Sequence, residues 1–172
     1  MNFKEKLNEI KAFIFDVDGV LSANCVPLDN DGELVRMLNV KDGYALNLAT
    51  KLGYPVAIIS GGKSEAVRKC LEFLGVQKVY LCAYDKKVEF YDFLNQFNLK
   101  TDQVLYMGDD IPDYEVMKMS GLATAPLDAA PEIRGIAHYV SDKNGGEGCV
   151  RDVIEQTLKA HGNWMTKEAF TW

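Results

Sequence analysis

Carboxylate side chains come in closely spaced groups at two places in the chain. Asp16 and Asp18 lie two positions apart, directly after an apolar run. The second group follows another apolar run and consists of Asp109, Asp110 and Asp113. Aspartates gathered in one place repel each other unless a cation neutralises them, and Mg²⁺ prefers such hard oxygen ligands. Together the two groups predict a site that binds Mg²⁺.

A hydroxyl, glycines and an ammonium group follow two further apolar runs. Ser60-Gly61-Gly62 follows one of them, and Asp85-Lys86 follows the next. Beside a metal ion, Lys86 would neutralise phosphate oxygens, while the Ser60 hydroxyl and nearby backbone N–H groups would bind the others. One carboxylate could then attack phosphorus, and a second, two residues on, could protonate the leaving alcohol and afterwards activate water. This set of residues predicts hydrolysis of a phosphate ester.

The elements that precede these residues must bring them together. Short apolar runs alternate with amphipathic stretches, which is typical of an α/β fold: a Rossmann-like parallel sheet with helices on both faces. The predicted strands are 12–15, 55–59, 79–82, 104–107 and 122–125, and the predicted helices are 43–52, 64–74, 86–97, 112–119 and about 148–160. Ligands bind beyond the carboxyl ends of parallel strands, so we expect the polar groups after four strands to meet at one edge.

One stretch breaks this alternation. Residues 23–40 show no helical period, and Asp29-Asn30-Asp31-Gly32 is a strong turn signal between extended segments. We expect a β-hairpin within about 23–38, with strands 25–28 and 33–38, that projects from the sheet. The alternative is a long surface loop. Residues 1–161 form one expected domain and 162–172 a C-terminal tail, either disordered or docked by its aromatic residues on a neighbouring subunit.

Composition limits the class of protein. The chain has 172 residues, of which 48% are hydrophobic and 26% charged, and a net charge of −6; this is typical of one soluble globular domain. An acidic chain without a basic run argues against nucleic acid as a partner. No apolar run approaches the roughly 20 residues of a membrane span. The charged N-terminus does not resemble a signal peptide, so we expect a cytoplasmic protein that does not bind a membrane.

The four cysteines have neither metal-binding nor redox spacing. Three of them have apolar neighbours in the sequence, and free cysteine is among the most buried residue types. We therefore expect three buried free thiols.

The polar motifs resemble those of the haloacid dehalogenase superfamily. The similar segments are Asp16-Val17-Asp18-Gly19-Val20-Leu21, Ser60, Lys86 and Gly108-Asp109-Asp110-x-x-Asp113, in the order of the four superfamily motifs. The resemblance implies Asp16 as nucleophile, Asp18 as general acid and base, and Ser60 and Lys86 as phosphate ligands. It also implies Mg²⁺ held by Asp16, by the backbone carbonyl of Asp18 and by Asp109, with either Asp113 or Asp110 in support.

The numbers of residues between Asp16 and Ser60 and between Ser60 and Lys86 leave no room for a cap domain, because the predicted strands, helices and hairpin fill both intervals. The resemblance is therefore to superfamily members without a cap domain. Further segments are similar to phosphatases of 3-deoxy-D-manno-octulosonate 8-phosphate and of related eight- or nine-carbon sugar-acid phosphates: Gly32-Glu33-Leu34, Asn39-Val40-Lys41-Asp42-Gly43-Tyr44, Asp85-Lys86 and Gly145-Gly146-Glu147-Gly148. The resemblance implies that the substrate contacts Asp18, Asn39, Val40, Lys41, Asp42, Gly43, Ser60, Gly61 and Lys86. It further implies a homotetramer built by the hairpins, in which a neighbouring subunit roofs the site, and a role in lipopolysaccharide biosynthesis.

The chain departs from this family at positions where arginines would meet a substrate carboxylate. Asn47, Gly62 and Cys70 stand at three such positions, and Lys41 replaces a further arginine without its bidentate geometry. Which sugar acid is used therefore stays open, and another phosphorylated sugar or metabolite is an alternative substrate. A receiver-type signalling module also phosphorylates an aspartate, but its motifs come in a different order. A phosphatase-like fold used only for binding is a third alternative.

Overall fold

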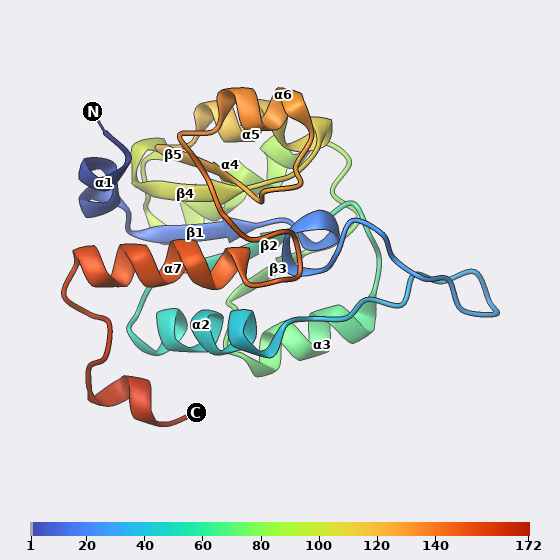
Figure 1. Cartoon of the computed structure of the whole chain (residues 1–172), viewed down its shortest axis with the longest axis horizontal. Coiled ribbons are helices and arrows are strands. Elements are labelled where there is room, and N and C mark those ends of the chain that lie inside the picture. The colour runs from blue at the N-terminus through green and yellow to red at the C-terminus, as the bar shows by residue number, and fades with distance from the viewer. Residues whose placement is uncertain (1) are drawn as a thin grey trace.

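A parallel sheet of six strands lies between two layers of helices in the computed structural model, which describes residues 2–172 (Figure 1). The strands are β1 (Ala12–Phe15), β2 (Val56–Ile59), β3 (Lys78–Tyr80), β4 (Val104–Met107), β5 (Leu122–Ala125) and β6 (Tyr139–Val140). The helices are α1 (Phe3–Lys6), α2 (Val40–Lys51), α3 (Glu65–Phe73), α4 (Lys86–Phe97), α5 (Tyr114–Met119), α6 (Pro131–Ile136) and α7 (Cys149–Ala160). This confirms the predicted α/β class.

The strand order is β3-β2-β1-β4-β5-β6, and every neighbouring pair is parallel. From β1 the chain adds β2 and β3 on one side of the sheet. It then crosses back and adds β4, β5 and β6 on the other side of β1. In such sheets the ligand crevice lies beyond the carboxyl ends of the two strands where the direction reverses. The topology therefore places a site after Phe15 of β1 and Met107 of β4.

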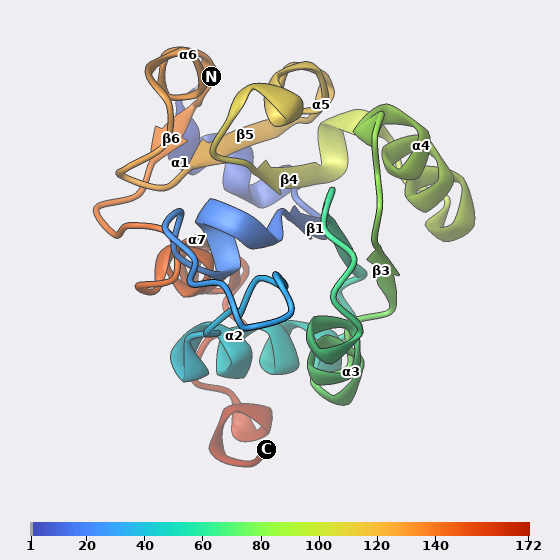
Figure 2. The same ribbon diagram turned by 90° about the vertical axis from the view of Figure 1, so that its right-hand side faces the viewer.

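Alternating side chains of β1 divide the core between the two helical layers. Phe13 and Phe15 pack into a buried cluster with α2, α3 and α7, whereas Ala12 and Ile14 pack into a second cluster with α4, α5 and α6. Figure 2 shows the two helical layers on opposite faces of the sheet. All four residues of β1 are buried, as expected for a strand covered on both faces.

Most predicted elements are confirmed, with differences at their ends. Strands β1, β4 and β5 and helix α4 have the predicted bounds. Helix α2 begins at Val40 rather than at Gly43, because the Asn39 side chain caps it and accepts hydrogen bonds from the N–H groups of Lys41 and Asp42. The predicted helix 112–119 is a short turn, Ile111–Asp113, followed by α5. The prediction missed β6, α1 and α6, which are too short to show a clear periodicity.

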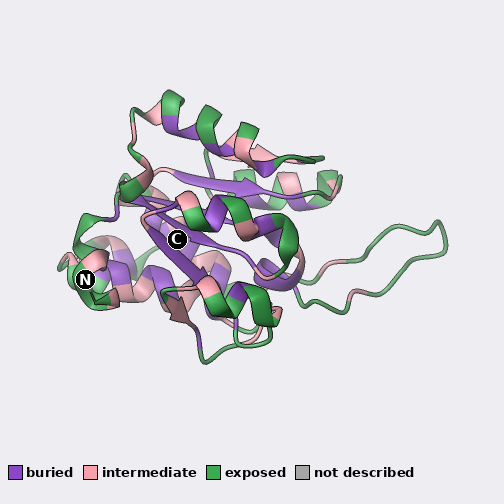
Figure 3. Cartoon of the chain, turned by 90° about the horizontal axis from the view of Figure 1, so that it is seen from above, coloured by how far each residue is buried: buried purple, intermediate pink, exposed green. Residues whose placement is uncertain are grey.

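The predicted hairpin is an arm, residues 23–38, that projects from the body of the protein (Figure 3). One antiparallel bridge joins Leu28 to Leu34, and the Asp29 carboxylate closes the turn by accepting bonds from the N–H groups of Asp31 and Glu33. The two strands predicted at 25–28 and 33–38 are therefore wrong in extent, since pairing stops after this bridge. Two exposed segments without a third strand gain little from a longer ladder. Within residues 2–172, no cap domain is inserted between β1 and α2 or between β2 and β3.

The C-terminal tail packs on its own chain. The Tyr44 hydroxyl donates to the carbonyl of Ala169 at 2.6 Å, and Lys51 Nζ donates to the carbonyl of Thr171 at 2.7 Å. The rings of Trp164 and Trp172 lie edge-on to Tyr44. These contacts tie the tail to α2 of its own chain, while Phe170 and Trp172 remain exposed.

The expectation of three buried cysteines is wrong. All four are free, but only Cys149 is buried, while Cys25, Cys70 and Cys82 are exposed. Cys25 lies on the arm, Cys70 on the outer side of α3 and Cys82 in a loop with a positive φ of 56°. Apolar sequence neighbours did not indicate burial here, because side-chain direction depends on position around the helix or loop. Among residues 2–172, no helix has the length and apolar character needed to cross a bilayer.

Candidate active site

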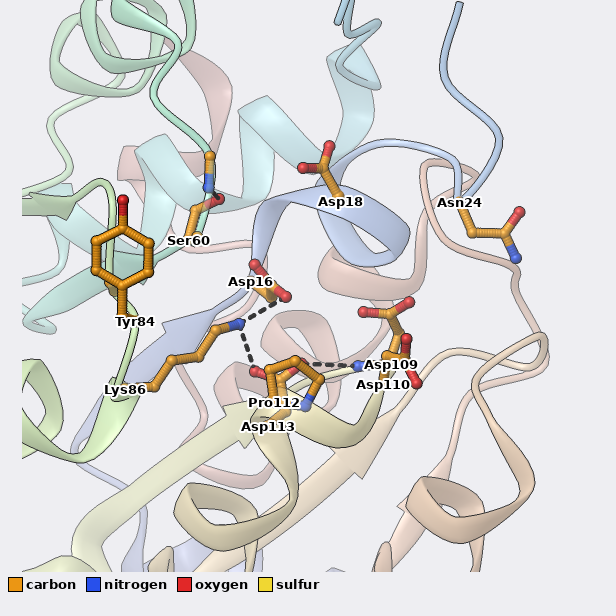
Figure 4. Close-up of a pocket in the computed structure, with 13 residues that line it drawn as sticks. Asp16, Asp18, Asn24, Ser60, Tyr84, Lys86, Asp109, Asp110, Pro112 and Asp113 are labelled. Carbon is orange, nitrogen blue, oxygen red and sulfur yellow. Dashed lines mark hydrogen bonds and ion pairs between the residues drawn. The ribbon is translucent and has the colours of Figure 1, made fainter.

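A cavity of about 500 Å³ opens where the carboxyl ends of β1 and β4 meet (Figure 4). It is lined by Asp16, Asp18, Asn24, Ser60, Gly61, Gly62, Ala83, Tyr84, Lys86, Asp109, Asp110, Pro112 and Asp113. Polar residues that follow four different strands therefore meet at one edge of the sheet, as the alternation of strands and helices predicted.

A buried ammonium group lies at the centre of the site. Lys86 is the first residue of α4 and only 5% exposed. Its Nζ lies 2.7 Å from Oδ2 of Asp16 and 2.7 Å from Oδ1 of Asp113, as the dashed lines in Figure 4 show. Burial alone lowers the pKa of Lys86, but the two carboxylates raise it above the usual value. Lys86 therefore stays cationic at the floor of the cavity.

Asp16 follows β1 directly, and its two carboxylate oxygens have different partners. Its Oδ1 accepts a 2.6 Å hydrogen bond from the N–H of Val17, and its Oδ2 faces Lys86. Burial, followed by the negative charge of Asp113, raises the pKa of Asp16 well above its usual range, although Lys86 works in the opposite direction. The site thus holds more negative charge than Lys86 alone compensates.

Three carboxylates, from Asp16, Asp109 and Asp113, form a cluster in which one oxygen of each lies within 4.8 Å of one oxygen of the others. Burial, together with the charges of Asp113 and Asp110, raises the pKa of Asp109 to about 7. Hard oxygen donors with excess negative charge fit a divalent cation such as Mg²⁺. Of the two supporting residues left open by the sequence, Asp113 lies in this cluster. The Asp110 carboxylate instead accepts from the N–H of Ile111 at the exposed start of a turn.

Two backbone features hold the acidic loops close together. Gly19 has a φ of +82°, and a Cβ at this position would overlap the carboxylate of Asp109. A glycine therefore permits both the backbone turn and the close approach. The N–H of Asp109 donates to Oδ2 of Asp113 at 3.2 Å, which fixes the second loop.

The prediction missed Tyr106, a buried residue of β4 whose hydroxyl donates to Oδ1 of Asp113 at 2.7 Å. Burial, followed by the charges of Asp113 and Asp16, raises the pKa of Tyr106, so the hydroxyl remains a donor. A tyrosine inside an otherwise apolar strand is a usable signal, because a buried phenol needs a hydrogen-bond partner. The sequence does not identify that partner.

Asp18 lies apart from the carboxylate cluster. Figure 4 shows its carboxylate above Asp16 rather than beside Asp109 and Asp113. Its oxygens accept hydrogen bonds from Arg36 of the arm and from Ser22. The prediction missed Arg36, since nothing in the sequence of the arm indicates that one of its side chains returns to the site.

The loop after β2 supplies the hydroxyl. Ser60 is buried, and its Oγ accepts a hydrogen bond from the N–H of Gly62 at 3.1 Å. Ser60 and Gly61 both line the cavity. Two backbone hydrogen bonds join this loop to the loop after β3. The N–H of Ala83 donates to the carbonyl of Ser60, and the N–H of Cys82 donates to the carbonyl of Gly62.

The predicted substrate-contact segment, residues 39–43, does not line this cavity. Asn39 caps α2 and also donates to the carbonyl of Gly146. Asp42 is 1% exposed, and its Oδ1 accepts from the N–H of Arg151 at the start of α7. Val40 and Lys41 are exposed, and Gly43 lies within α2 against Leu74.

Of the three positions where family arginines are absent, one lies in the cavity. Gly62 lines it. Asn47 donates to the carbonyl of Leu74, and Cys70 lies on α3 in a separate depression beside the arm. Among the residues that line the cavity, Lys86 is the only cation.

Several known proteins with similar sequences and structures are phosphatases. Residues 83–154 match the haloacid dehalogenase-like hydrolase family. The 3-deoxy-D-manno-octulosonate 8-phosphate phosphatase KdsC of Salmonella typhi is 38% identical over 157 residues, which cover 91% of this chain and 84% of that protein.

Two solved structures show the same fold. The crystal structure of the 3-deoxy-D-manno-octulosonate 8-phosphate phosphatase of Yersinia pestis matches with a TM-score of 0.90 and 34% identity, covering 94% of this chain and 87% of that one. The phosphatase of Moraxella catarrhalis, in complex with magnesium ion, phosphate ion and KDO, matches with a TM-score of 0.89 and 29% identity over 94% and 93% of the two chains. The chain therefore belongs to the haloacid dehalogenase-like hydrolases and, within them, to the family of the 3-deoxy-D-manno-octulosonate 8-phosphate phosphatases.

Proposed function

We propose that this phosphatase hydrolyses 3-deoxy-D-manno-octulosonate 8-phosphate, or a closely related sugar-acid phosphate, through an aspartyl-phosphate on Asp16. The observation that carries the proposal is the buried contact of Lys86 with both Asp16 and Asp113 at the floor of the cavity. This contact keeps one carboxylate beside a fixed cation where a phosphate would enter. The relatives named above have the same activity and match most of this chain.

The first half of the reaction moves the phosphoryl group to the enzyme. An oxygen of Asp16 forms a bond to phosphorus, the bond from phosphorus to the sugar oxygen breaks, and its electron pair stays on that oxygen. Asp18 supplies the proton that turns the leaving oxygen into an alcohol. Lys86, the Ser60 hydroxyl and the N–H groups that follow Ser60 would stabilise the charge on the remaining phosphate oxygens.

The second half releases phosphate. Asp18, now ionised, takes a proton from water, whose oxygen bonds to phosphorus while the bond to Asp16 breaks. Asp16 is thereby restored as a carboxylate, and Asp18 again carries its proton. The same cations stabilise the phosphate oxygens in both steps, so Lys86 need not move.

Mg²⁺ would be held by Asp16 and Asp109, by the backbone carbonyl of Asp18 and, in support, by Asp113. When bound it supplies positive charge beside the transferring phosphate. The clustered oxygens support this choice. Burial, followed by the charge of neighbouring carboxylates, raises the pKa of both Asp16 and Asp109, and a bound cation would offset both effects.

The direct test replaces the nucleophile. Asp16→Asn should abolish phosphate release from the sugar-acid phosphate in the presence of Mg²⁺, with an unchanged circular-dichroism spectrum. Asp102→Asn is a matched control, because Asp102 is exposed and precedes β4 at the opposite edge of the sheet. Near-normal turnover of Asp16→Asn would refute the assignment of the nucleophile.

Substrate choice needs a separate measurement. The absence of arginine from the cavity lining favours a second candidate class, phosphorylated sugars that carry no carboxylate. A panel of sugar phosphates and sugar-acid phosphates compared by kcat/KM separates the two classes. A clear preference for the sugar-acid phosphate supports the proposal, and a clear preference for esters without a carboxylate contradicts it.

We further propose a homotetramer in which the arms contact other subunits. Leu28, Val35 and Met37 of the arm expose 67%, 46% and 79% of their surface, and such apolar exposure is typical of interaction sites. In this assembly the exposed Val40 and Lys41 would face the site of another subunit, which is how residues 39–43 would contact substrate. Light scattering measures the mass, and a monomer at working concentrations would contradict the proposal.

We also propose a cytoplasmic location and a single domain over residues 1–161 that the tail supplements. Four free cysteines are what a reducing compartment favours. The tail contacts α2 mainly through hydrogen bonds to backbone carbonyls, which supports a supplementary role. Fractionation of cells and truncation of the tail test these two points.

A further inference from the structure

The arm sends one side chain back to the site. Arg36 lies on the returning limb of the arm, and its side chain is only 6% exposed. Its neighbours Val35 and Met37 are exposed. A buried guanidinium group on an otherwise exposed arm needs a partner of opposite charge, because burying an unpaired charge is costly.

That partner is the carboxylate of Asp18. Arg36 Nε donates to Oδ1 at 2.7 Å, and Arg36 Nη2 donates to Oδ2 at 2.9 Å. A planar guanidinium that binds both oxygens fixes the orientation of a carboxylate as well as its position. Asp18 nevertheless remains 37% exposed and lines the cavity, so it is held without being covered.

Gly62 leaves the space that the guanidinium occupies. A Cβ at position 62 would lie 2.7 Å from Arg36 Nη2 and 3.4 Å from Ser60 Oγ. A side chain at this position would therefore collide with the end of Arg36. The arm, the Asp18 loop and the Ser60 loop meet at this one group.

We propose that Arg36 is a positioning residue that aligns Asp18 for proton transfer to the leaving oxygen. When Asp18 acts as the acid, one of its oxygens leaves the guanidinium and turns its proton to the leaving oxygen, while the other oxygen keeps its bond to Arg36 and fixes the carboxyl group. This inference rests on the proposed function, in which Asp18 is the acid. The arm then does more than extend outward, because proton donation in the site depends on an arm residue of the same chain. Arg36 itself contacts neither the phosphorus nor the leaving oxygen.

The dependence of rate on the leaving group separates this role from a purely structural one. A sugar alkoxide is a poor leaving group and needs a proton as the bond to phosphorus breaks, whereas p-nitrophenolate is stable as an anion and does not. Because kcat/KM reports only the steps up to release of the first product, it includes the proton donation of Asp18 and excludes the later attack of water. Misalignment of Asp18 should therefore affect the two esters differently.

The experiment compares kcat/KM for the sugar-acid phosphate and for p-nitrophenyl phosphate in wild type, Arg36→Met and Arg36→Lys. Loss of aligned acid catalysis should lower kcat/KM of Arg36→Met for the sugar ester roughly 30-fold or more, and far less for the aryl ester. Arg36→Lys should recover part of the loss. Arg134→Met is the matched control, since Arg134 is exposed on α6. An equal loss with both esters, or no loss, would overturn the proposal.

A second variant reaches the same guanidinium from the other side. Gly62→Ala should push Arg36 away from Asp18, and the fold should tolerate it because the colliding atom is the end of a flexible side chain. In wild type it should lower kcat/KM for the sugar-acid phosphate relative to kcat/KM for p-nitrophenyl phosphate. In Arg36→Met it should have no further effect on this ratio, because that variant has no guanidinium to displace. Independent effects in the double variant would contradict the proposal.

The failure of this inference is distinguishable from failure of the proposed function. If wild type hydrolyses neither ester, or if Asp16→Asn stays active, the proposed function fails and the role of Arg36 fails with it. If Asp16→Asn is inactive while Arg36→Met leaves the ratio between the two esters unchanged, only the role of Arg36 is refuted. Activity of Arg36→Met on the aryl ester shows that the variant is folded.

Discussion

Asp42 is a buried carboxylate at the junction of α2 and α7, and it makes stability depend on pH. Its Oδ1 accepts from the N–H of Arg151 at 2.7 Å, and Oδ2 has no hydrogen-bond partner among the described residues. Burial raises the pKa of Asp42 from its ordinary 3.8 to about 6, although the N–H groups of Arg151 and Gly148 act in the opposite direction. The folded protein therefore retains a proton that the unfolded chain has lost.

The sign and size of the effect follow from this difference. Between pH 3.8 and about 6 the unfolded state binds fewer protons than the folded state, so the free energy of unfolding falls as pH rises. Each unit of pKa corresponds to about 1.4 kcal/mol, so the fully developed loss is about 3 kcal/mol, reached above pH 6. Roughly 2 kcal/mol of this loss lies between pH 4.5 and 7.5. Below pH 3.8 the loss disappears.

Asp42→Asn removes the titration and keeps an oxygen that can accept from Arg151. We expect the stability of this variant relative to wild type to increase by roughly 2 kcal/mol between pH 4.5 and 7.5, as measured by urea unfolding at a series of pH values. Subtracting the wild-type stability from that of the variant at each pH removes the contribution of the active-site carboxylates, because both proteins contain them. Asp102→Asn should show no such trend. A difference between Asp42→Asn and wild type that does not change with pH would refute the reasoning.

Three further predictions concern the site and the tail. Tyr106→Phe removes a hydrogen bond to Asp113, so kcat should fall about tenfold with an unchanged fold by circular dichroism; normal turnover would show that Asp113 needs only Lys86. Chelation with EDTA should stop phosphate release, and added Mg²⁺ should restore it and raise Tm because the carboxylate cluster is neutralised; hydrolysis without metal would contradict the cluster argument. Deletion of residues 163–172 removes the bonds from Tyr44 and Lys51 and should lower Tm by about 5 °C in a calorimetric scan, and an unchanged Tm, turnover and oligomer mass would show that the tail contributes nothing.

The fold class and the main site residues could be predicted because they depend on local patterns. Buried parallel strands appear as short continuous apolar runs, and the polar residues after them meet at one edge whatever the details of packing. Asp16, Ser60, Lys86 and Asp109 all follow strands in this way. The start of α4 was equally clear, because Asp85 caps it and accepts from the N–H of Lys87.

Predictions that relied on sequence neighbours alone were less accurate. Three of the four cysteines were expected to be buried, yet Cys25, Cys70 and Cys82 are exposed, because the direction of a side chain depends on its position around a helix or in a loop. Asp42 belongs to a segment predicted to contact substrate, yet it is buried against α7. Only the packing of α2 on α7 determines which way its carboxylate points.

The sequence by itself determined the α/β sheet, the edge at which the polar residues gather and the residue types present there. The tertiary structure decided which partners these residues have. Tyr106 reaches Asp113, Asp113 rather than Asp110 joins the carboxylate cluster, and Arg36 returns from the arm to Asp18. These contacts are set by loop paths and by excess charge in a buried space, neither of which a local pattern records. For that reason the residue types at this edge could be predicted from the sequence, while the partners of these residues could not.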